Sequence, residues 1–220
     1  MSRPLQQVAL AAAFALSMSG AARSAERASG PAPDRPGDRR QLPPAGTYTL
    51  DPPHTFVYFS ARHQVVGQVR GRFDKVAGTL VVDPALGACT VDVTIAAASV
   101  DTQVSRRDED LRSAAFFDAA SFPTIRYRGR GVRRTARGWA IDGALTIRDV
   151  TKTVPLIFEF AGAAPAEKGQ PARVAFHARA ETMRAQFGMV RELAEEIGLD
   201  AGGADVVIEI DAEALAAAKR

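Results

Sequence analysis

Apolar and polar residues alternate one by one along most of this chain. The clearest segment is 139–148, where Ile141, Leu145 and Ile147 take every second position and Asp142 lies between them. The same period of two recurs in residues 89–95, 125–130, 154–160, 173–180 and 206–211. A repeat of two residues is typical of strands with one face in a core and one in water. Because strands of parallel sheets are buried on both faces, the pattern indicates antiparallel sheets.

Short polar stretches separate these segments. DPALGA (83–88), RRTARG (133–138) and RDVTKT (148–153) have the composition of hairpin connections. These rules give about eight strands. An eight-stranded meander can close into a barrel, which removes its exposed edges. The sequence therefore predicts an all-β fold, an eight-stranded antiparallel barrel with one or two short helices.

Two stretches depart from the strand pattern and predict helices. In residues 105–117, Ser105 is the expected N-cap, and Leu111 and Phe117 fall on one helical face. Phe116 lies about 100° around the helix from Phe117, so it points elsewhere. Residues 191–199 form the second helical pattern. A pair of short helices at one end of a barrel indicates plugs or a lid.

Three phenylalanines, Phe116, Phe117 and Phe122, crowd the connection that leads into the strand at 125–130. Connections normally run over the surface and are polar. The rings either line a channel beside a ligand or plug the barrel without one, since small barrels do both. Small inward residues favour a cavity, because Ala61, Gly71 and Gly143 stand where a filled core would need bulk. The interpretation therefore favours a ligand channel.

The first 45 residues lie before the barrel pattern. Arg3, the apolar run Val8–Met18 and the small residues up to Ser24 form a secretory signal peptide pattern. The alternative is an uncleaved anchor, although the run is short for a membrane span. The predicted organisation is a signal peptide at 1–24, a flexible Pro-, Gly- and charge-rich linker at 25–45 and a barrel domain at 46–215. The predicted location is the periplasm.

Charge argues against nucleic acid as a partner. The formal net charge is +3, and residues 1–24 carry two arginines and no acid, so the mature chain has a net charge of +1. The remaining basic pairs, such as Arg106–Arg107, stand beside acids or alone. They are typical of solvated faces and not of a clustered basic stripe.

Cys89 is the single cysteine, so an internal disulfide and a cysteine-based metal cluster are excluded. It shares the apolar parity of its strand with Val91 and Val93, which predicts a buried thiol.

The three histidines do not suggest a metal site. His54 and His63 stand at opposite ends of one strand, and His177 faces outward. His63 lies on the inward face, where it could touch a polar head group or serve as a hydrogen-bonded structural histidine. Phosphate loops and hydrolase or metalloprotease motifs are absent from the sequence. The sequence therefore predicts neither catalytic residues nor a metal.

Several motifs together carry a family resemblance. They are YTLDPPHTFVYFSARH (48–63), VRGRFDKVAGTL (69–80), SVDTQVSRRDEDLRSAAFFDAASFPTIRY (99–127), GALTIRDVTKTVPL (143–156) and MRAQFGM (183–189). In these the domain resembles the YceI-like family of secreted or periplasmic lipocalin-like barrels, over nearly all of residues 46–214. The stretch 188–205 departs from the pattern, because a longer helical segment replaces a short loop before the last strand. This departure leaves the shape of the cavity mouth open.

The resemblance implies a binding protein and not an enzyme. Its expected ligand is an apolar single-chain lipid or isoprenoid: a polyisoprenoid, an isoprenoid quinone or a fatty-acid-like chain. Cofactors other than such a bound lipid or quinone are not expected. An envelope interaction or stress protein with a purely structural barrel is the alternative, supported by outward-facing Phe56 and Tyr58. An enzyme acting on the bound lipid is a third reading, and transient membrane contact and a homodimer stay open.

The residues expected to line the cavity combine inward parity with the family motifs. They are Val57, Phe59, Ala61, His63, Phe73, Phe116, Phe117, Phe122, Ile125, Tyr127, Ile141, Gly143, Leu145, Leu156, Phe158, Phe176 and Phe187.

Overall fold

The computed structural model describes residues 41–63, 67–167, 169–190 and 206–217, with only the backbone of His63. Three predictions concern residues outside these ranges. They are the signal peptide at 1–24, most of the linker at 25–45 and the second helix at 191–199.

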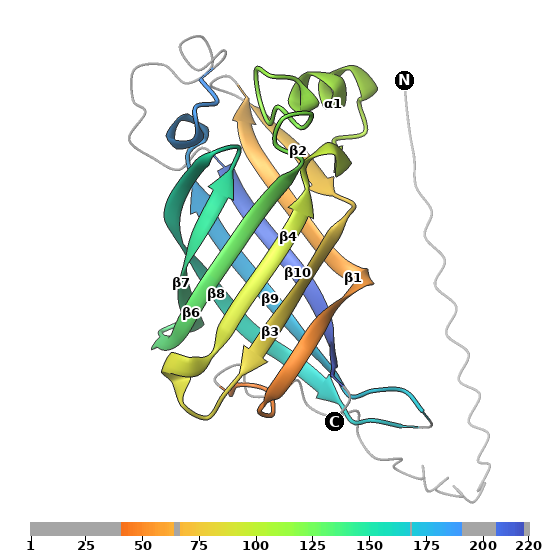
Figure 1. Cartoon of the computed structure of the whole chain (residues 1–220), viewed down its shortest axis with the longest axis vertical. Helices are drawn as coiled ribbons and strands as arrows, with labels where there is room; N and C mark the ends of the chain where they lie inside the picture. The colour runs from red at the N-terminus through yellow and green to blue at the C-terminus, as the bar shows by residue number, and fades with distance from the viewer. Residues whose placement is uncertain (1–40, 64–66, 168, 191–205, 218–220) are drawn as a thin grey trace, which may run out of the picture. The chain divides into compact units, whose positions relative to one another are not determined.

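Ten strands form one antiparallel sheet in the described residues (Figure 1). They are β1 (Gly46–His63), β2 (Gly67–Phe73), β3 (Val76–Val82), β4 (Thr90–Ala96), β5 (Val100–Asp101), β6 (Thr124–Thr135), β7 (Gly138–Ile147), β8 (Val150–Ala164), β9 (Arg173–Thr182) and β10 (Val206–Ala216). The order is β10-β9-β8-β7-β6-β4-β3-β1-β2-β5, and β10 also pairs with β1. This last pairing closes the sheet into a barrel.

The barrel has eight strand positions, as the alternation predicts. β3 pairs with the first part of β1, from Gly46 to Thr49, and β2 pairs with its last part, from Val57 to His63. β2 and β3 therefore occupy one position and are interrupted at residues 74–75. β5 is a two-residue strand that pairs with the end of β2.

The short helices lie at the ends of the barrel. They are α1 (Ser105–Arg112) and the 3-10 helices η1 (Leu86–Ala88), η2 (Ala97–Ser99) and η3 (Arg184–Phe187). We call the end that carries α1 the upper end (Figure 1). None of the described helices has the length and apolar character to cross a bilayer.

Two predicted hairpins are confirmed. β7 and β8 are joined by the two residues Arg148 and Asp149, and Arg148 has a φ of 58°. A positive φ in a two-residue loop matches the twist of the strands it joins. β6 and β7 are likewise joined by residues 136–137.

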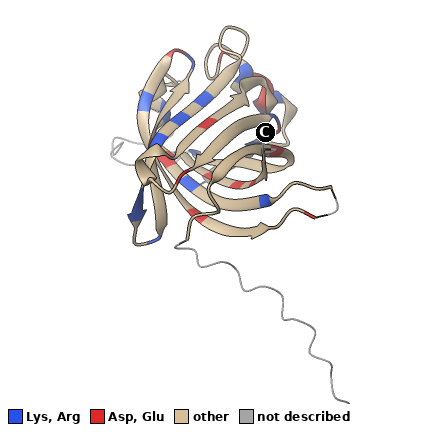
Figure 2. Cartoon of the chain, turned by 60° about the horizontal axis from the view of Figure 1, so that its bottom comes forward, with Lys and Arg blue, Asp and Glu red and all other residues tan. Residues whose placement is uncertain are grey.

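The predicted face of each alternating segment is also confirmed. On β7, Ile141, Leu145 and Ile147 are buried, whereas Asp142 is exposed. Charged residues alternate with uncharged ones along the strands (Figure 2). The apolar faces meet inside the barrel, where one cluster of buried side chains joins nearly all the strands.

The predicted helix at 105–117 is too long, because α1 ends at Arg112. Ser113 adopts an extended backbone with ψ of 168°, and its hydroxyl donates to the carbonyl of Asp110 at 2.6 Å. Such local bonds offer the chain an alternative to the helical ladder. The expected cap is wrong as well. Val104 occupies the N-cap position, and no side chain bonds the helix start there.

A buried carboxylate fixes α1 to the barrel instead. Oδ1 of Asp108 accepts hydrogen bonds from the backbone N–H of Thr102 at 2.8 Å and from its hydroxyl at 2.6 Å. Nε of Arg107 donates to the same hydroxyl oxygen at 2.8 Å. Thr102 and Asp108 are both buried, so the network holds α1 close to β5 at the upper end.

Candidate ligand-binding cavity

Two cavities lie inside the barrel among the described residues, and four lining residues are common to both. The lower cavity has a volume of about 160 Å³ and the upper cavity about 390 Å³. Both are lined by Val57, Ile95, Leu145 and Ile208, which come from β1, β4, β7 and β10. We call these four residues the waist. Because all four are aliphatic, the boundary between the cavities is apolar.

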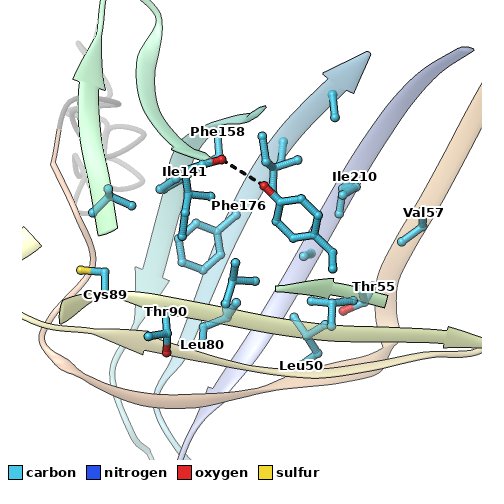
Figure 3. A pocket seen from close by; sticks show the side chains of 18 of the residues that line it. Leu50, Thr55, Val57, Leu80, Cys89, Thr90, Ile141, Phe158, Phe176 and Ile210 are labelled. Carbon is cyan, nitrogen blue, oxygen red and sulfur yellow. Dashed lines mark hydrogen bonds between the residues drawn. The ribbon is translucent and has the colours of Figure 1, made fainter. Parts of the chain in front are cut away.

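The lower cavity is enclosed by inward side chains from all around the barrel (Figure 3). Leu50, Leu80, Ile141, Phe176 and Ile210 point into it. No charged side chain is present among the described residues that line it.

Two polar side chains of the lower cavity are hydrogen-bonded within the protein. The hydroxyl of Thr55 donates to the carbonyl of Asp51 at 2.9 Å. The phenol of Tyr127 donates to the carbonyls of Ile141 at 3.0 Å and Val154 at 2.9 Å. Burial raises the pKa of Tyr127, which keeps the phenol protonated as a donor. The lower cavity therefore presents mainly apolar surface to an occupant, and the hydroxyls of Thr55 and Tyr127 are already bonded.

A row of aromatic rings lines the upper cavity. The ring centroid of Phe73 lies 5.6 Å from that of Phe59 and 5.6 Å from that of Phe117, the second pair edge to face. Phe116, on the connection after α1, also lines this cavity. Phe187 of η3 is 1% exposed and lines this cavity too. Rings from β1, β2, η3 and the connection after α1 thus converge on one space.

Charged side chains line the upper cavity as well. They are Arg62 of β1, Arg106, Arg107 and Asp110 of α1, and Arg184 of η3. Thr182, at the end of β9, lines the same cavity and is buried. Its hydroxyl oxygen has no hydrogen-bond partner within the described residues. The two cavities therefore differ, since among the described residues charged side chains line only the upper one.

Most of the residues predicted to line a cavity do so. Val57, Tyr127, Ile141, Leu145, Leu156, Phe158 and Phe176 line the lower cavity, and Val57, Phe59, Ala61, Phe73, Phe116, Phe117, Ile125, Leu145 and Phe187 line the upper one. The predicted contact of His63 with a head group concerns a side chain outside the described part of the chain.

The structure differs from the prediction at Phe122. This residue lines neither cavity. Its ring is half-buried and lies 5.8 Å from the guanidinium carbon of Arg148 in the β7–β8 turn. The helix ends sooner than predicted, so the chain turns at Asp118 with a φ of 46° and carries Phe122 away from the interior.

Gly143 and Gly71 also differ from expectation, because neither leaves space for a ligand. A Cβ at Gly143 would lie 2.2 Å from Cζ of Tyr127, and one at Gly71 would lie 2.6 Å from Cζ of Phe59. Each glycine faces inward, but a neighbouring aromatic ring already fills its space. Among the three small residues that favoured a cavity, only Ala61 lines one.

Sequence reasoning missed several lining residues. Leu42 and Pro43, placed in the predicted linker, line the lower cavity, and Pro43 is buried. The phenol of Tyr48 donates to the carbonyl of Pro44 at 2.7 Å, which fixes this segment to β1. A lone Leu-Pro-Pro triplet gives no periodic signal. Thr182 was missed because polar residues on a strand are normally assigned to the wet face.

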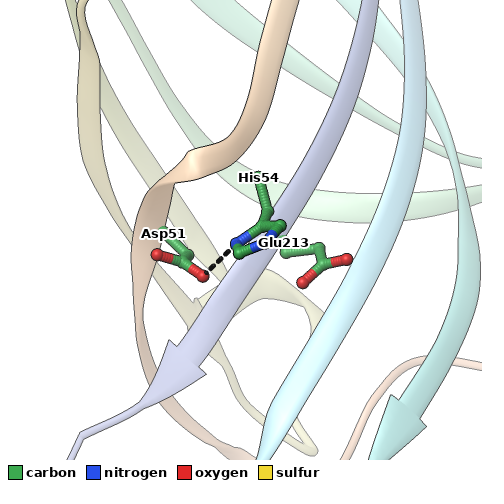
Figure 4. A group of neighbouring side chains, drawn as sticks. All are labelled: Asp51, His54 and Glu213. Carbon is green, nitrogen blue, oxygen red and sulfur yellow. Dashed lines mark hydrogen bonds and ion pairs between the residues drawn. The ribbon is translucent and has the colours of Figure 1, made fainter.

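A cluster of Asp51, His54 and Glu213 on β1 and β10 has the composition of a metal site (Figure 4). Arg173 of β9 lies among them. Its Nη1 is 2.5 Å from Oδ2 of Asp51 and 3.4 Å from Nδ1 of His54, and it also bonds the carboxylate of Glu213. The hydrogen bond from His54, followed by Arg173, lowers the pKa of Asp51. Because the guanidinium already supplies the positive charge, we interpret the cluster as an ion-pair network.

Comparisons with known proteins agree with this architecture. A UPF0312 protein of Vibrio cholerae is 32% identical over 123 residues, which are 54% of this chain and 65% of the relative. A UPF0312 protein of Yersinia enterocolitica is 30% identical over 121 residues, 54% of this chain and 63% of the relative. The alignments thus span a little under two thirds of these relatives.

Solved structures match a larger share of the chain. The Campylobacter jejuni YceI protein superposes with a TM-score of 0.58 at 25% identity, over 71% of this chain and 90% of the other. A domain from Saccharophagus degradans superposes with a TM-score of 0.55 at 15% identity, over 77% and 98%. The family model for the YceI-like domain matches residues 48–214. The chain therefore belongs to the YceI-like family.

Proposed function

We propose that this protein is a non-catalytic carrier that encloses one long apolar chain along its barrel axis. The expected classes are polyisoprenoids, isoprenoid quinones and fatty-acid-like lipids. The observation that carries the proposal is the pair of cavities that share the aliphatic waist, the lower one apolar and the upper one lined mostly by apolar residues. The Saccharophagus degradans domain, which shares the fold, is described as a polyisoprenoid binding domain.

The shape of the interior favours a chain over a compact ligand. Sites for small molecules typically have volumes of about 300–1,000 Å³, and a polar group or two fixes the orientation of the ligand. The upper cavity, at about 390 Å³, lies within this range. The lower cavity is smaller and continues it beyond the waist. A flexible single chain can fill both cavities, whereas a bulky rigid ligand would fill the upper one alone.

We also propose that the protein works in the periplasm after export. Arg3 and the apolar run Val8–Met18 support this location. Fusing residues 1–30 to an export-dependent reporter should yield reporter activity outside the inner membrane. Reporter retained in the cytoplasm would contradict the proposed location.

An envelope interaction protein is the second candidate function. Phe56 and Tyr58 of β1 are 39% and 38% exposed, and Tyr58 also lines the upper cavity. Their ring centroids are 6.0 Å apart with nearly parallel planes. Exposed aromatic residues that form a patch are frequent at protein contacts.

Native mass spectrometry of protein recovered from its own cell envelope separates the two candidates. The carrier function predicts a stoichiometric adduct with the mass of a single-chain lipid. The same protein, delipidated and mixed with a long-chain lipid, should take up one molecule. A barrel that is empty on recovery and stays empty on mixing would contradict the carrier function and favour the interaction protein.

A further inference from the structure

The two cavities differ in the charge of their described lining residues, and this difference assigns a direction to a bound chain. In the lower cavity, the hydroxyl of Thr55 and the phenol of Tyr127 donate to backbone carbonyls, and the thiol of Cys89 bonds the backbone of Asp83. An occupant there meets no open donor from these three groups. The lower cavity therefore suits a hydrocarbon tail.

The upper cavity has an unsatisfied donor instead. Thr182 is 8% exposed, and its hydroxyl has no partner within the part of the chain that the structure describes. Buried polar groups almost always find a partner, and each exception requires an explanation. The hydroxyl oxygen of Thr182 is itself covered, so rotation about χ1 would have to turn it toward a bound polar head, which would then accept its hydrogen bond.

Charge at the upper cavity defines the head group further. Among the residues that the structure describes, four arginines, Arg62, Arg106, Arg107 and Arg184, line it together with one acid, Asp110. They come from β1, α1 and η3, so the chain brings them together from three distant segments. Arg107 is bonded to Thr102, and Arg184 donates to the carbonyl of Arg62 at 3.4 Å. The excess of positive charge favours an anion.

We propose that the upper cavity selects ligands with an anionic head, a carboxylate or a phosphate, which Thr182 and the arginines bind while the tail passes the waist. The proposal rests on the carrier function proposed above. Arginine guanidinium groups pair with carboxylate and phosphate by charge-assisted hydrogen bonds. An uncharged head, such as an alcohol, makes only neutral hydrogen bonds in the same place. The preference therefore depends on charge and not on the chain.

The test compares three ligands with the same sixteen-carbon chain: hexadecanoate, hexadecyl phosphate and hexadecanol. Dissociation constants are measured on delipidated full-domain protein by titration below the aggregation concentration of each ligand. We expect at least one anionic ligand to bind about tenfold or more tightly than hexadecanol, from the strength of charge-assisted bonds. Comparison of the carboxylate with the phosphate identifies which head is preferred.

Two arginine variants and a control variant test whether the arginines of the upper cavity cause the preference for an anionic head. Arg106→Gln and Arg184→Gln should each weaken binding of the anionic ligand about tenfold and leave hexadecanol unchanged. Arg133→Gln removes the same charge from an exposed arginine that pairs with Asp142 outside the cavities, and it should change neither affinity. Because Arg106 is exposed on α1, its replacement keeps the test valid even if Arg184→Gln does not fold.

The outcomes separate this inference from the carrier function. If all three ligands fail to bind, the carrier function itself is wrong. If hexadecanol binds as tightly as the anionic ligands, the carrier function stands and the anionic head is wrong. Equal weakening of anionic and neutral ligands by Arg106→Gln and Arg184→Gln would also overturn the inference, because the arginines would then act through packing. Thr182→Val should weaken anion binding without lowering the melting temperature of the empty protein, since it removes an unsatisfied hydroxyl.

Discussion

The phenol ring of Tyr127 occupies the space that a side chain at Gly143 would need. A Cβ built on Gly143 would lie 2.2 Å from Cζ of the ring and 2.5 Å from its hydroxyl oxygen. The hydroxyl donates to the carbonyl of Ile141 on β7 and to that of Val154 on β8. Tyr127 thus links its own strand, β6, to the next two strands. Gly143 therefore makes room for the Tyr127 ring and not for a ligand.

This relationship predicts that Gly143→Ala destabilises the empty protein. The new methyl group would have to displace the ring and its hydrogen bonds, and overpacking of a core typically costs about 1–3 kcal/mol. Denaturant unfolding of the delipidated protein measures the change. Gly87→Ala is the matched control, because a Cβ there has no neighbour within 4 Å. Equal free energies of unfolding for the two variants would show that the position of the Tyr127 ring does not require a glycine at residue 143.

The neighbouring residues Phe116 and Phe117 should have separable roles. Phe117 packs edge to face on Phe73 and joins the core cluster, whereas Phe116 lines the upper cavity outside that cluster. Phe117→Ala should lower the stability of both empty and loaded protein by about 3 kcal/mol, the lower end of the range for buried phenylalanine. Phe116→Ala should mainly weaken ligand binding. Melting curves of both variants, delipidated and reloaded, measure the two effects.

The matched control is each variant's own empty state. If Phe116→Ala destabilises the empty barrel as much as Phe117→Ala does, both rings are core residues. The connection after α1 would then be purely structural.

The sequence predicts the features of the fold that follow from alternation along a strand, and it does not predict those that depend on local hydrogen bonds. The face of each strand follows from alternation, because one shift in register would expose Ile141, Leu145 and Ile147 together. The end of α1 does not follow, because a local bond of Ser113 competes with the helical ladder. Leu111 and Phe117 nevertheless both pack against the core cluster, although only Leu111 lies in the helix.

The sequence predicts a cavity residue only where alternation along a single strand is enough to place its side chain inside the barrel. Alternation places Tyr127 and Gly143 on the inner face of their strands. It cannot show that the Tyr127 ring fills the space beside Gly143, because the two residues lie on different strands. It also cannot reveal that Leu42 and Pro43 fold back onto the lower cavity. The arginines of the upper cavity come from segments far apart in sequence, so their proximity is visible only in the fold.

The buried thiol gives a third prediction. Cys89 is 5% exposed, and its Sγ lies 3.4 Å from both the N and the O of Asp83. A thiol reagent should therefore react with Cys89 only in unfolded protein. Labelling is followed by mass spectrometry with and without denaturant. Native protein that reacts as fast as denatured protein would show that Cys89 is not held in this position.

The ion-pair network around Asp51 predicts a specific dependence of stability on pH. Hydrogen bonding by His54 and the charge of Arg173 hold the pKa of Asp51 below its usual value of 3.8. The folded protein therefore binds this proton less readily than the unfolded chain. The resulting stabilisation is complete above the unfolded pKa and is lost as the pH falls through the folded pKa.

Asp51→Asn should accordingly reduce the free energy of unfolding at neutral pH, and its difference from the wild type should shrink below about pH 4. Denaturant unfolding across the acidic range measures this difference. Asp211→Asn is the control, because Asp211 also bonds a histidine, His177, but both side chains are more than half exposed. It should have a small effect at every pH. A constant difference for Asp51→Asn down to low pH would contradict the account.

The central claim is that the two cavities hold one continuous chain. The most direct test measures affinity and stoichiometry of delipidated protein for a series of single-chain ligands with one head group and increasing length. A chain that passes the waist should bind one per barrel, and each added CH₂ should contribute about 0.8 kcal/mol, close to fourfold in affinity, until the lower cavity is full. Val57 and Leu145 at the waist would then contact the middle of the chain. Failure of every length to bind, or an affinity that stops rising once the upper cavity alone is filled, would contradict the claim.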